Sequence, residues 1–203
     1  MKGLLLISGG IDSPVAGHLM IKEEFEIFPV HFSSSSIVGN EPEEKSIAAC
    51  KKLGLDKILI ADISDFLKEI AEKCNRRYYF VLMKRAMHKI AEKIANEKNF
   101  DFIVTGENLG QVSSQTLQNI LVIDKAVNIP VIRPLIAFDK MEIVDLAKKI
   151  ETYEISKGPE MCDVLGPKHP STQAKEENIL EEENKIDFAN FLKNIEISEI
   201  KLN

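Results

Sequence analysis

The sequence contains few of the residues that mark several broad classes of protein. It has no Trp, and aromatic residues make up only 6% of its 203 residues. A core drawn from the 44% of hydrophobic residues must therefore consist mainly of Ile, Leu, Val and Ala. Cys50, Cys74 and Cys162 form neither a CxxC pair nor a His-Cys metal spacing, and their odd number argues against a disulfide framework. These cysteines are still compatible with a single reactive thiol.

Long hydrophobic runs and an excess of positive charge are also missing. The apolar runs, such as Leu4 to Ile7, are far too short to span a bilayer, and no signal or transit peptide precedes them. We therefore expect a cytoplasmic protein without membrane contact. The net charge of −6 argues against indiscriminate nucleic-acid binding, because phosphate contacts require Lys and Arg. A local basic face is still compatible with this charge.

Strand-like and helix-like segments alternate along most of the chain. The predicted strands are Lys2–Ile7, Phe25–Phe32, Lys57–Ala61, Asp101–Thr105 and Pro130–Arg133. The predicted helices are Pro14–Lys22, Glu41–Leu53, Ile63–Cys74, Tyr79–Glu97, Gln111–Val127 and Lys140–Ile150. Such alternation requires crossover connections, and it predicts an α/β fold with an open parallel sheet of about five strands and helices on both faces.

The alternation stops after Glu151. Residues 156–171 form a predicted irregular loop that carries Cys162. The dense charge run Lys175–Lys185 favours a solvated helix, and Phe188–Leu192 is a short amphipathic piece. We assign residues 1–155 to one α/β domain, and residues 156–203 to a cysteine-bearing loop and a charged helical extension packed on that domain.

The strongest local signal is the segment SGGIDS, which follows the first strand and opens a helix. Gly9 and Gly10 let the backbone turn tightly and approach an anion, and the helix start offers unpaired amides. Ser8 and Ser13 add hydroxyl donors, and Asp12 is suited to a Mg²⁺ ion that bridges phosphate oxygens. The segment fits neither GxxxxGK[ST] nor GxGxxG, and a plain tight turn is the alternative.

SGGxDS is the signature of PP-loop ATP pyrophosphatases, which cleave ATP between its α and β phosphates. Three further segments resemble the catalytic domain of tRNA 4-thiouridine synthetases. They are VTGENLGQVSSQT at 104–116, RPLI at 133–136 with DK and EI following, and PEMC at 159–162 with Pro167-Lys168 downstream. This resemblance implies an adenine nucleotide α-hydrolase-like, Rossmann-like fold, a thiamine biosynthesis-like family, and a requirement for ATP and Mg²⁺.

The resemblance also implies which residues bind the nucleotide. The predicted ATP-binding residues are Leu6, Ile7, Ser8, Gly9, Gly10, Asp12, Ser13, His31, Phe32, Arg85, Gly106 and Gln115. Ligands of open parallel sheets bind at the carboxyl ends of the strands, where Ile7, His31 and Gly106 are predicted to lie. His31 could contribute its backbone or its imidazole. Arg85 and Gln115 could instead face water.

The predicted catalytic residues are Cys162 and Asp12. Lys157, Lys168 and His169 surround Cys162 in the sequence, and cationic neighbours favour a thiolate. In the resembling family this cysteine takes part in sulfur transfer, so we hypothesise that Cys162 attacks a persulfide or receives sulfur from one. Asp12 would orient a metal ion or a phosphate and would not act as a base.

The function implied by the resemblance is adenylation of a uridine carbonyl in tRNA, at position eight, followed by its conversion to 4-thiouridine. The sequence shows no THUMP-type RNA-binding region and no rhodanese domain. We therefore expect tRNA to be bound through a separate RNA-binding partner or an oligomer, and sulfur to come from a persulfide carrier or sulfide. The basic stretch Arg76–Lys93 could guide RNA. Cys74 as a resolving thiol is left open.

Two other functions compete with this one. The first is a PP-loop enzyme that adenylates a small-molecule substrate in sulfur metabolism, which the acidic charge favours. The second is a non-catalytic nucleotide-binding module. The presence of Asp12, Arg85, Gln115 and Cys162 together argues against the second, because binding alone needs no thiol.

Overall fold

The computed structural model describes residues 1–158 and 164–202. Within these residues the strands form one six-stranded sheet in the order β5-β4-β1-β2-β3-β6. The strands are β1 (Lys2–Leu6), β2 (Glu26–Ser33), β3 (Lys57–Asp62), β4 (Phe102–Val104), β5 (Val131–Ile132) and β6 (Ile197–Lys201). Strands β1 to β5 pair in parallel, and β6 runs antiparallel to β3. The predicted α/β class with a largely parallel open sheet is confirmed.

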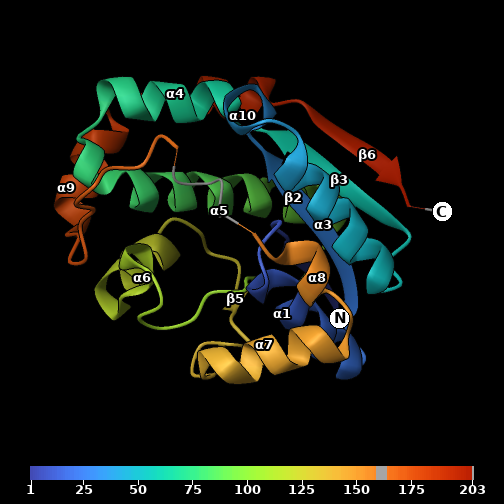
Figure 1. Cartoon of the computed structure of the whole chain (residues 1–203). Helices are drawn as coiled ribbons and strands as arrows, with labels where there is room; N and C mark the ends of the chain where they lie inside the picture. Colours follow the sequence, from blue (N-terminus) through green and yellow to red (C-terminus); the bar gives the residue numbers. More distant parts are fainter. Residues whose placement is uncertain (159–163, 203) are drawn as a thin grey trace.

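The helices fall between the strands, as the alternation predicts. They are α1 (Asp12–Lys22), α2 (Ser35–Val38), α3 (Glu41–Lys52), α4 (Ser64–Lys73), α5 (Tyr79–Lys98), α6 (Leu117–Asp124), α7 (Lys140–Lys149), α8 (Tyr153–Ser156), α9 (Glu176–Glu183) and α10 (Phe188–Asn194). Short 3-10 turns cover Arg76–Tyr78 and Ser113–Gln115. Figure 1 shows α4 and α10 at the top of the molecule and α7 at the bottom. In the described part of the chain, every helix is too short or too polar to cross a membrane.

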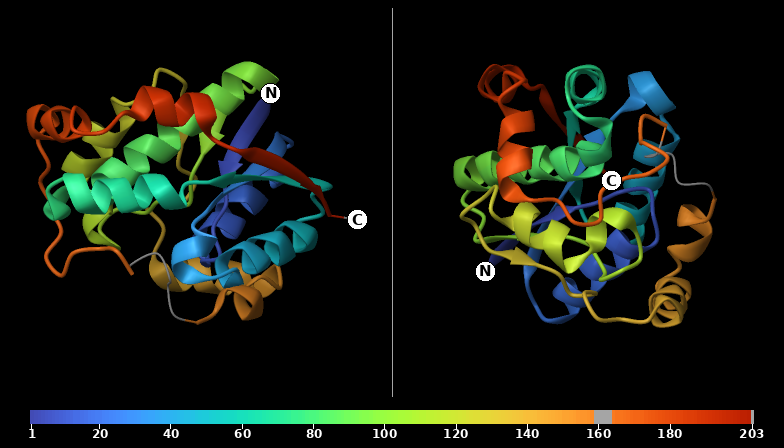
Figure 2. Two further views of the ribbon diagram at one scale, coloured as in Figure 1. Left: turned by 90° about the horizontal axis from the view of Figure 1, so that it is seen from above. Right: turned by 90° about the vertical axis from the view of Figure 1, so that its left-hand side faces the viewer.

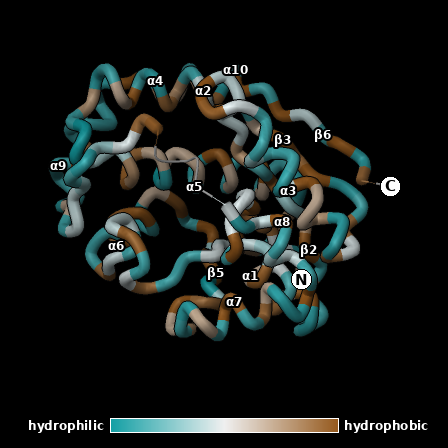
Figure 3. The backbone as a smooth tube through the Cα atoms, in the orientation of Figure 1, coloured by the Kyte–Doolittle hydropathy of each residue, from teal (hydrophilic) through white to brown (hydrophobic). Residues whose placement is uncertain are grey.

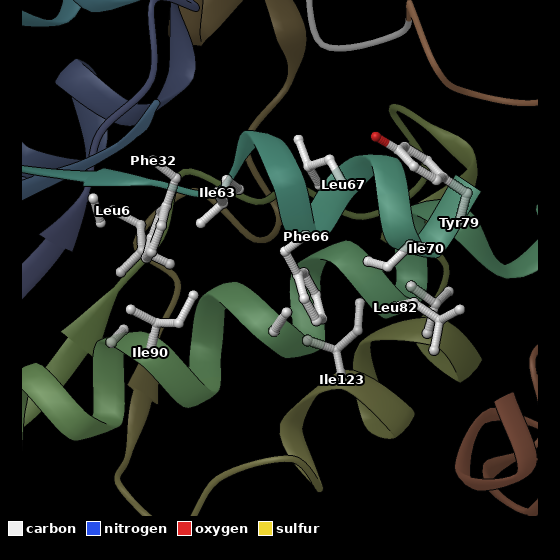
Figure 4. Packing of buried hydrophobic residues seen from close by; sticks show 14 of the residues in the cluster. Leu6, Phe32, Ile63, Phe66, Leu67, Ile70, Tyr79, Leu82, Ile90 and Ile123 are labelled. Atoms are coloured by element: carbon white, nitrogen blue, oxygen red, sulfur yellow. The ribbon is translucent and has the colours of Figure 1, made fainter. Parts of the chain in front are cut away.

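Alternate side chains of β1 divide between two hydrophobic cores, because successive residues of a strand point to opposite faces of a sheet. Leu4 and Leu6 join a core formed with α4, α5 and α6. Figure 4 shows Leu6 and Phe32 facing Ile90 of α5 within this core. Leu5 and Ile7 join the second core, which contains residues of α1, α3 and α7. Helices therefore cover both faces of the sheet, and Figure 3 shows hydrophobic and hydrophilic stretches alternating along α6 and α7.

The segment predicted as one helix, Gln111–Val127, is divided. Gly110 has a φ of 77°, a 3-10 turn follows, and α6 begins only at Leu117. Thr116 is extended and its side chain accepts a hydrogen bond from the amide of Asn119, which is the geometry of a helix N-cap. The single-helix prediction was therefore wrong at its amino-terminal third.

The C-terminal region differs from its prediction in two ways. The charge run forms α9, but one side of that helix is buried, because Ile179 is 0% exposed and Glu182 is 8% exposed. In addition, the pattern ISEIK forms β6, which pairs with β3 and was not predicted. Figure 2 shows β6 at the edge of the molecule beyond β3. The proposed division of the chain at residue 155 stays a prediction.

The strand order fixes where a ligand can bind. β1 lies between β2 and β4, so the chain leaves it toward one side and later returns on the other. In open parallel sheets the crevice at such a reversal, at the carboxyl ends of the strands, is the common binding site. Here the residues that follow β1 and β4 are the Ser8–Ser13 loop and the Thr105–Asn108 segment.

Candidate nucleotide-binding site

The Ser8–Ser13 loop is closed by hydrogen bonds between its own serines. The amide of Ser8 donates to Ser13 Oγ at 2.9 Å, and the amide of Gly10 donates to Ser8 Oγ at 3.3 Å. Helix α1 starts at Asp12. Its N-cap residue is Ile11, whose side chain cannot accept a hydrogen bond from the first-turn amides. The amides of the first turn, with the positive end of the helix dipole, thus favour an anion such as a phosphate.

Gly106 lies directly against the start of α1. A Cβ atom on Gly106 would lie 2.6 Å from the amide nitrogen of Ser13 and 2.8 Å from the carbonyl carbon of Asp12. Only glycine fits such an approach without a shift of the backbone. The structure therefore brings together two of the predicted ATP-binding segments, the loop after β1 and the segment after β4.

Helix α3 closes the loop from the other side. A Cβ atom on Gly9 would lie 3.1 Å from the carbonyl oxygen of Pro42 and 3.2 Å from Cβ of Lys45. The Lys45 ammonium donates to the carbonyl oxygen of Lys157 at 3.3 Å. The chain that leads into residue 159 is thus attached to the same helix that supports Gly9.

His31 is a buried link between β1 and α3. Its Nδ1 lies 3.1 Å from the carbonyl oxygen of Ile7 and 3.0 Å from Ser46 Oγ, and the Ser46 hydroxyl donates to Pro42. Because the Ser46 proton is used in that bond, Nδ1 carries the proton and donates. Burial lowers the pKa of His31, and the nearby Ile7 carbonyl and Glu43 oppose this only in part. The imidazole therefore has a structural role at the end of β1, beside the buried Phe32.

Gln115 offers an acceptor that the described residues do not use. The residue is 9% exposed, and its Oε1 is buried without a hydrogen-bond partner within the described part of the chain. Its backbone is held, because its carbonyl oxygen accepts from the amide of Gly110 at 2.9 Å. Buried acceptors are normally satisfied, so an unpaired one fits a ligand that supplies a donor, such as the amino group of an adenine.

The side chain of Arg85 is buried between helices. Its side chain is 3% exposed, so the alternative of a solvated face was wrong. The guanidinium donates to both carboxylate oxygens of Glu183 on α9, at 2.8 and 3.0 Å, and to the carbonyl oxygen of Val122 on α6. These bonds occupy the guanidinium between helices, so the predicted contact between Arg85 and ATP gains no support from this geometry.

The adjacent Lys84 reaches the segment after β4 instead. Its ammonium donates to Glu107 Oε1 at 2.6 Å, and Arg133 Nε donates to Glu107 Oε2 at 2.8 Å. Burial raises the pKa of Glu107, but the charges of Lys84 and Arg133, with the hydrogen bond from Lys84, outweigh burial and hold the pKa well below its usual range. Glu107 and Arg133 were both within motifs quoted from the sequence, yet no role was predicted for either. The sequence signal that could have identified them is a charged residue shortly after each of two adjacent strands, β4 and β5.

The three cysteines divide into two groups. Cys50 and Cys74 are buried, and burial raises the pKa of Cys50 to about 12 and that of Cys74 to about 11. Both thiols are therefore protonated near neutral pH, and a role of Cys74 as a resolving thiol stays a hypothesis. Cys162 lies outside the described residues, so its predicted role stays a prediction.

Asp12 is the acidic residue of the first turn of α1. In the described part of the chain, no group of three or more His, Cys, Asp or Glu side chains could hold a metal ion. Mg²⁺ usually binds through one or two carboxylates together with substrate phosphates, and a single Asp12 beside a phosphate loop fits that mode.

The chain matches the family described as "Thiamine biosynthesis protein (ThiI)" over residues 1–188. It is 43% identical over 208 aligned residues to a "Probable tRNA sulfurtransferase" of Caldanaerobacter subterraneus subsp. tengcongensis, covering 99% of this chain and 54% of the relative. A relative of the same description from Alkaliphilus oremlandii is 46% identical, over 92% of this chain and 49% of its own length. The chain thus spans about half the length of the curated relatives it matches.

Solved structures give the same picture. "Crystal structure of a 4-thiouridine synthetase - RNA complex with bound ATP" is similar with a TM-score of 0.90 and 35% identity, covering 98% of this chain and 55% of that one. NMN synthetase from Francisella tularensis, at 16% identity and a TM-score of 0.59, covers 95% and 83% of the two chains and supports the fold alone. The chain belongs to the ThiI family.

Proposed function

We propose that this chain is the catalytic part of an ATP-dependent tRNA sulfurtransferase that makes 4-thiouridine at position eight. The observation that carries the proposal is the contact between Gly106 and the Ser13 amide, which joins the SGGIDS loop to the TGE segment at the carboxyl edge of β1 and β4. Support for the substrate comes from the similar solved structure, whose description names both bound ATP and RNA. A cytoplasmic location stays a prediction.

In the first step, the carbonyl oxygen at C4 of the uridine attacks the α-phosphorus of ATP. The bond from the α-phosphorus to the bridging oxygen breaks, and pyrophosphate leaves with the electron pair. The amides of the Ser8–Ser13 loop and of the first turn of α1 bind and orient the phosphate groups through this step. Asp12 would hold Mg²⁺, which when bound neutralises charge on the phosphate oxygens. Gln115 Oε1 would accept from the adenine amino group.

In the second step, the terminal sulfur of a persulfide, or sulfide itself, attacks C4 and AMP leaves with the electron pair of the C–O bond. With a persulfide, the product at C4 is still joined to the carrier through a disulfide bond. The Cys162 thiolate then attacks the carrier sulfur, which forms a new disulfide and releases the thiocarbonyl. With sulfide, loss of a proton gives the thiocarbonyl directly.

A small-molecule substrate is the second candidate, and the pairing of the basic helix is compatible with it. Cations of the basic stretch Arg76–Lys93 are largely engaged within the protein. Lys84 pairs with Glu107, and both Arg85 and Lys89 pair with Glu183. The stretch therefore offers RNA much less free charge than its sequence predicts, which is compatible either with a separate RNA-binding partner or with a substrate other than RNA.

One experiment separates the candidates. AMP and pyrophosphate release from ATP and Mg²⁺, and the 4-thiouridine content of the tRNA, are measured with unmodified tRNA for the wild type and for Cys162→Ala. Each protein is assayed without a sulfur donor, with sulfide and with a persulfide donor. We expect tRNA to stimulate AMP formation, and we expect Cys162→Ala to keep adenylation while losing thiolation with a persulfide donor. If tRNA has no effect in any combination, including with added RNA-binding partner, the tRNA assignment is wrong. Release with small carbonyl compounds alone would favour the second candidate.

A further inference from the structure

Glu107 gathers three hydrogen bonds in a nearly dry environment. Its side chain is only 7% exposed, and it accepts from Lys84 Nζ at 2.6 Å, from Arg133 Nε at 2.8 Å and from Thr105 Oγ1 at 3.2 Å. Arg133 in turn donates through both terminal nitrogens to Asp124, at 3.1 and 2.5 Å. One carboxylate therefore connects α5, the end of α6, and the segments that follow β4 and β5.

This cluster surrounds the residue that touches α1. Gly106 has no side chain, so the residues on either side of it set its position. The Thr105 amide donates to the Ile132 carbonyl oxygen at 3.1 Å, and Asn108 Nδ2 donates to the carbonyl oxygens of Leu135 and Phe138 at 2.7 and 2.6 Å. The residues on either side of Gly106 are Thr105 and Glu107. The Thr105 hydroxyl donates to Glu107, and Glu107 accepts from Lys84 and Arg133, so both are held by side-chain hydrogen bonds.

Stability alone is a poor reason for such an arrangement. Removing a carboxylate, an ammonium and a guanidinium from water costs free energy that their mutual attraction often only balances, and apolar side chains of similar volume can serve as well. Charged hydrogen bonds do impose a narrow geometry, because they are short and directional. The cluster therefore fits a segment whose position must be exact to a fraction of an ångström.

We propose that Glu107 is a positioning residue for the nucleotide: by holding Thr105, Lys84 and Arg133, it fixes Gly106 against the first turn of α1. This contact would set the spacing between the α1 amides, which bind phosphate in the function proposed above, and the segment after β4. The proposal rests on the ATP-dependent function argued above. Glu107 itself need not touch ATP, since it acts through the backbone of Gly106.

Helix α5 supplies a matched control on another part of its surface. Glu183 of α9 accepts from Arg85 and from Lys89 at 2.9 Å, and its side chain is 16% exposed. It is thus a second carboxylate bonded to an Arg and a Lys, but these bonds join α5 to α9 and involve no residue after β4. Glu183→Gln removes a comparable buried charge without changing a group that flanks Gly106.

The test compares Glu107→Gln with Glu183→Gln. Tm is measured by circular dichroism, and the Kd of ATP is measured by isothermal titration calorimetry with Mg²⁺, without tRNA, well below both Tm values. Both variants should lower Tm, and only Glu107→Gln should weaken ATP binding, by about tenfold or more, since hydrogen bonds to charged groups are the strong ones. Unchanged ATP affinity in Glu107→Gln overturns the proposal. Equal weakening in both variants also overturns it, since the effect would then follow from lost stability.

A milder variant covers the case in which Glu107→Gln does not fold. Thr105→Val keeps the shape of the side chain and removes one bond to Glu107, and we expect ATP affinity to fall about threefold. An unchanged Kd in this variant contradicts the proposal. Failure of the proposed function is seen separately, because a wild type that binds ATP but makes no AMP with tRNA leaves the comparison of Kd values intact.

Discussion

The Nδ1 atom of His31 and the carbonyl oxygen of Ile7 lie 3.1 Å apart, which ties β2 to β1 at the residue before the nucleotide loop. His31 is 5% exposed, so the bond is shielded from water. The same nitrogen reaches Ser46 of α3, and α3 in turn supports Gly9. The position of the loop thus depends on a buried imidazole that has no need to touch the nucleotide.

We predict that His31→Ala lowers the free energy of unfolding by about 2 to 4 kcal/mol, since it leaves a cavity and an unpaired carbonyl oxygen. Urea unfolding at pH 7.5 measures this. His18→Ala on α1, whose side chain is half-buried, is the control and should cost about 1 kcal/mol or less. Equal losses in the two variants would contradict the structural role of His31.

A second prediction concerns pH. His88 is 2% exposed, and burial lowers its pKa, with Glu107 and the Lys84 carbonyl opposing this and the charges of Arg133 and Lys84 adding to it. Between the folded pKa and the unfolded value near 6.5, the unfolded chain binds more protons than the folded one. The stability present above the unfolded pKa is therefore lost as pH falls through that interval.

We expect the Tm of the wild type to fall between pH 7 and pH 5, and we expect His88→Asn to show a smaller fall over the same interval. Differential scanning calorimetry at several pH values measures both. His31 shares the lowered pKa, so part of the pH dependence should persist in the variant. A wild-type Tm that is constant or rises toward pH 5 would rule out buried neutral histidines as a source of stability.

Much of the fold follows from local pattern. The apolar run of β1, followed by Gly9 and Gly10 and a helix-forming stretch, is a pattern that predicts a strand, a turn and a helix. The contact between Gly106 and Ser13 could be predicted as a shared edge of the sheet, because both segments follow parallel strands. The sequence resemblance named both segments, and the topology explains why they meet.

Other features depend on tertiary pairing that no local pattern carries. Lys84 and Arg85 are adjacent in a basic helix, and only the packing of α9 decides that Arg85 faces Glu183 while Lys84 faces Glu107. The alternation in β6 is short and lies in a charged tail, so its pairing with β3 depends on the edge that β3 leaves open. The charge run of α9 predicts a solvated helix, because the sequence does not show that Glu183 in this run pairs with Arg85 and Lys89 of α5.

The close approach of Gly106 gives a third prediction. In Gly106→Ala the new Cβ would lie 2.6 Å from the Ser13 nitrogen, so the backbone of α1 or of the segment after β4 must move. We expect a loss of about 2 kcal/mol or more in the free energy of unfolding. In Gly10→Ala the new Cβ would lie 3.4 Å from Ser8 Oγ, an ordinary contact and the only one within 4 Å among the described residues, so stability should change by about 0.5 kcal/mol or less. Guanidinium unfolding of both variants measures the difference, and a Gly10→Ala variant that loses as much as Gly106→Ala would contradict the geometry.

The cysteines give a fourth prediction, which bears on sulfur chemistry. Thiolates and not thiols react with iodoacetamide, and burial raises the pKa of Cys50 to about 12 and that of Cys74 to about 11. At pH 8 the folded protein should therefore alkylate Cys50 and Cys74 at least about a hundredfold more slowly than a free thiol does. Mass spectrometry of peptides after timed labelling measures each site, and the same protein in urea should label both at the rate of an exposed cysteine.

Since these two thiols are protected, any fast labelling of the folded protein must come from Cys162. Fast labelling of Cys74 in the folded state would instead make Cys74 available as a resolving thiol, and slow labelling at all three sites would argue against the proposed thiol step.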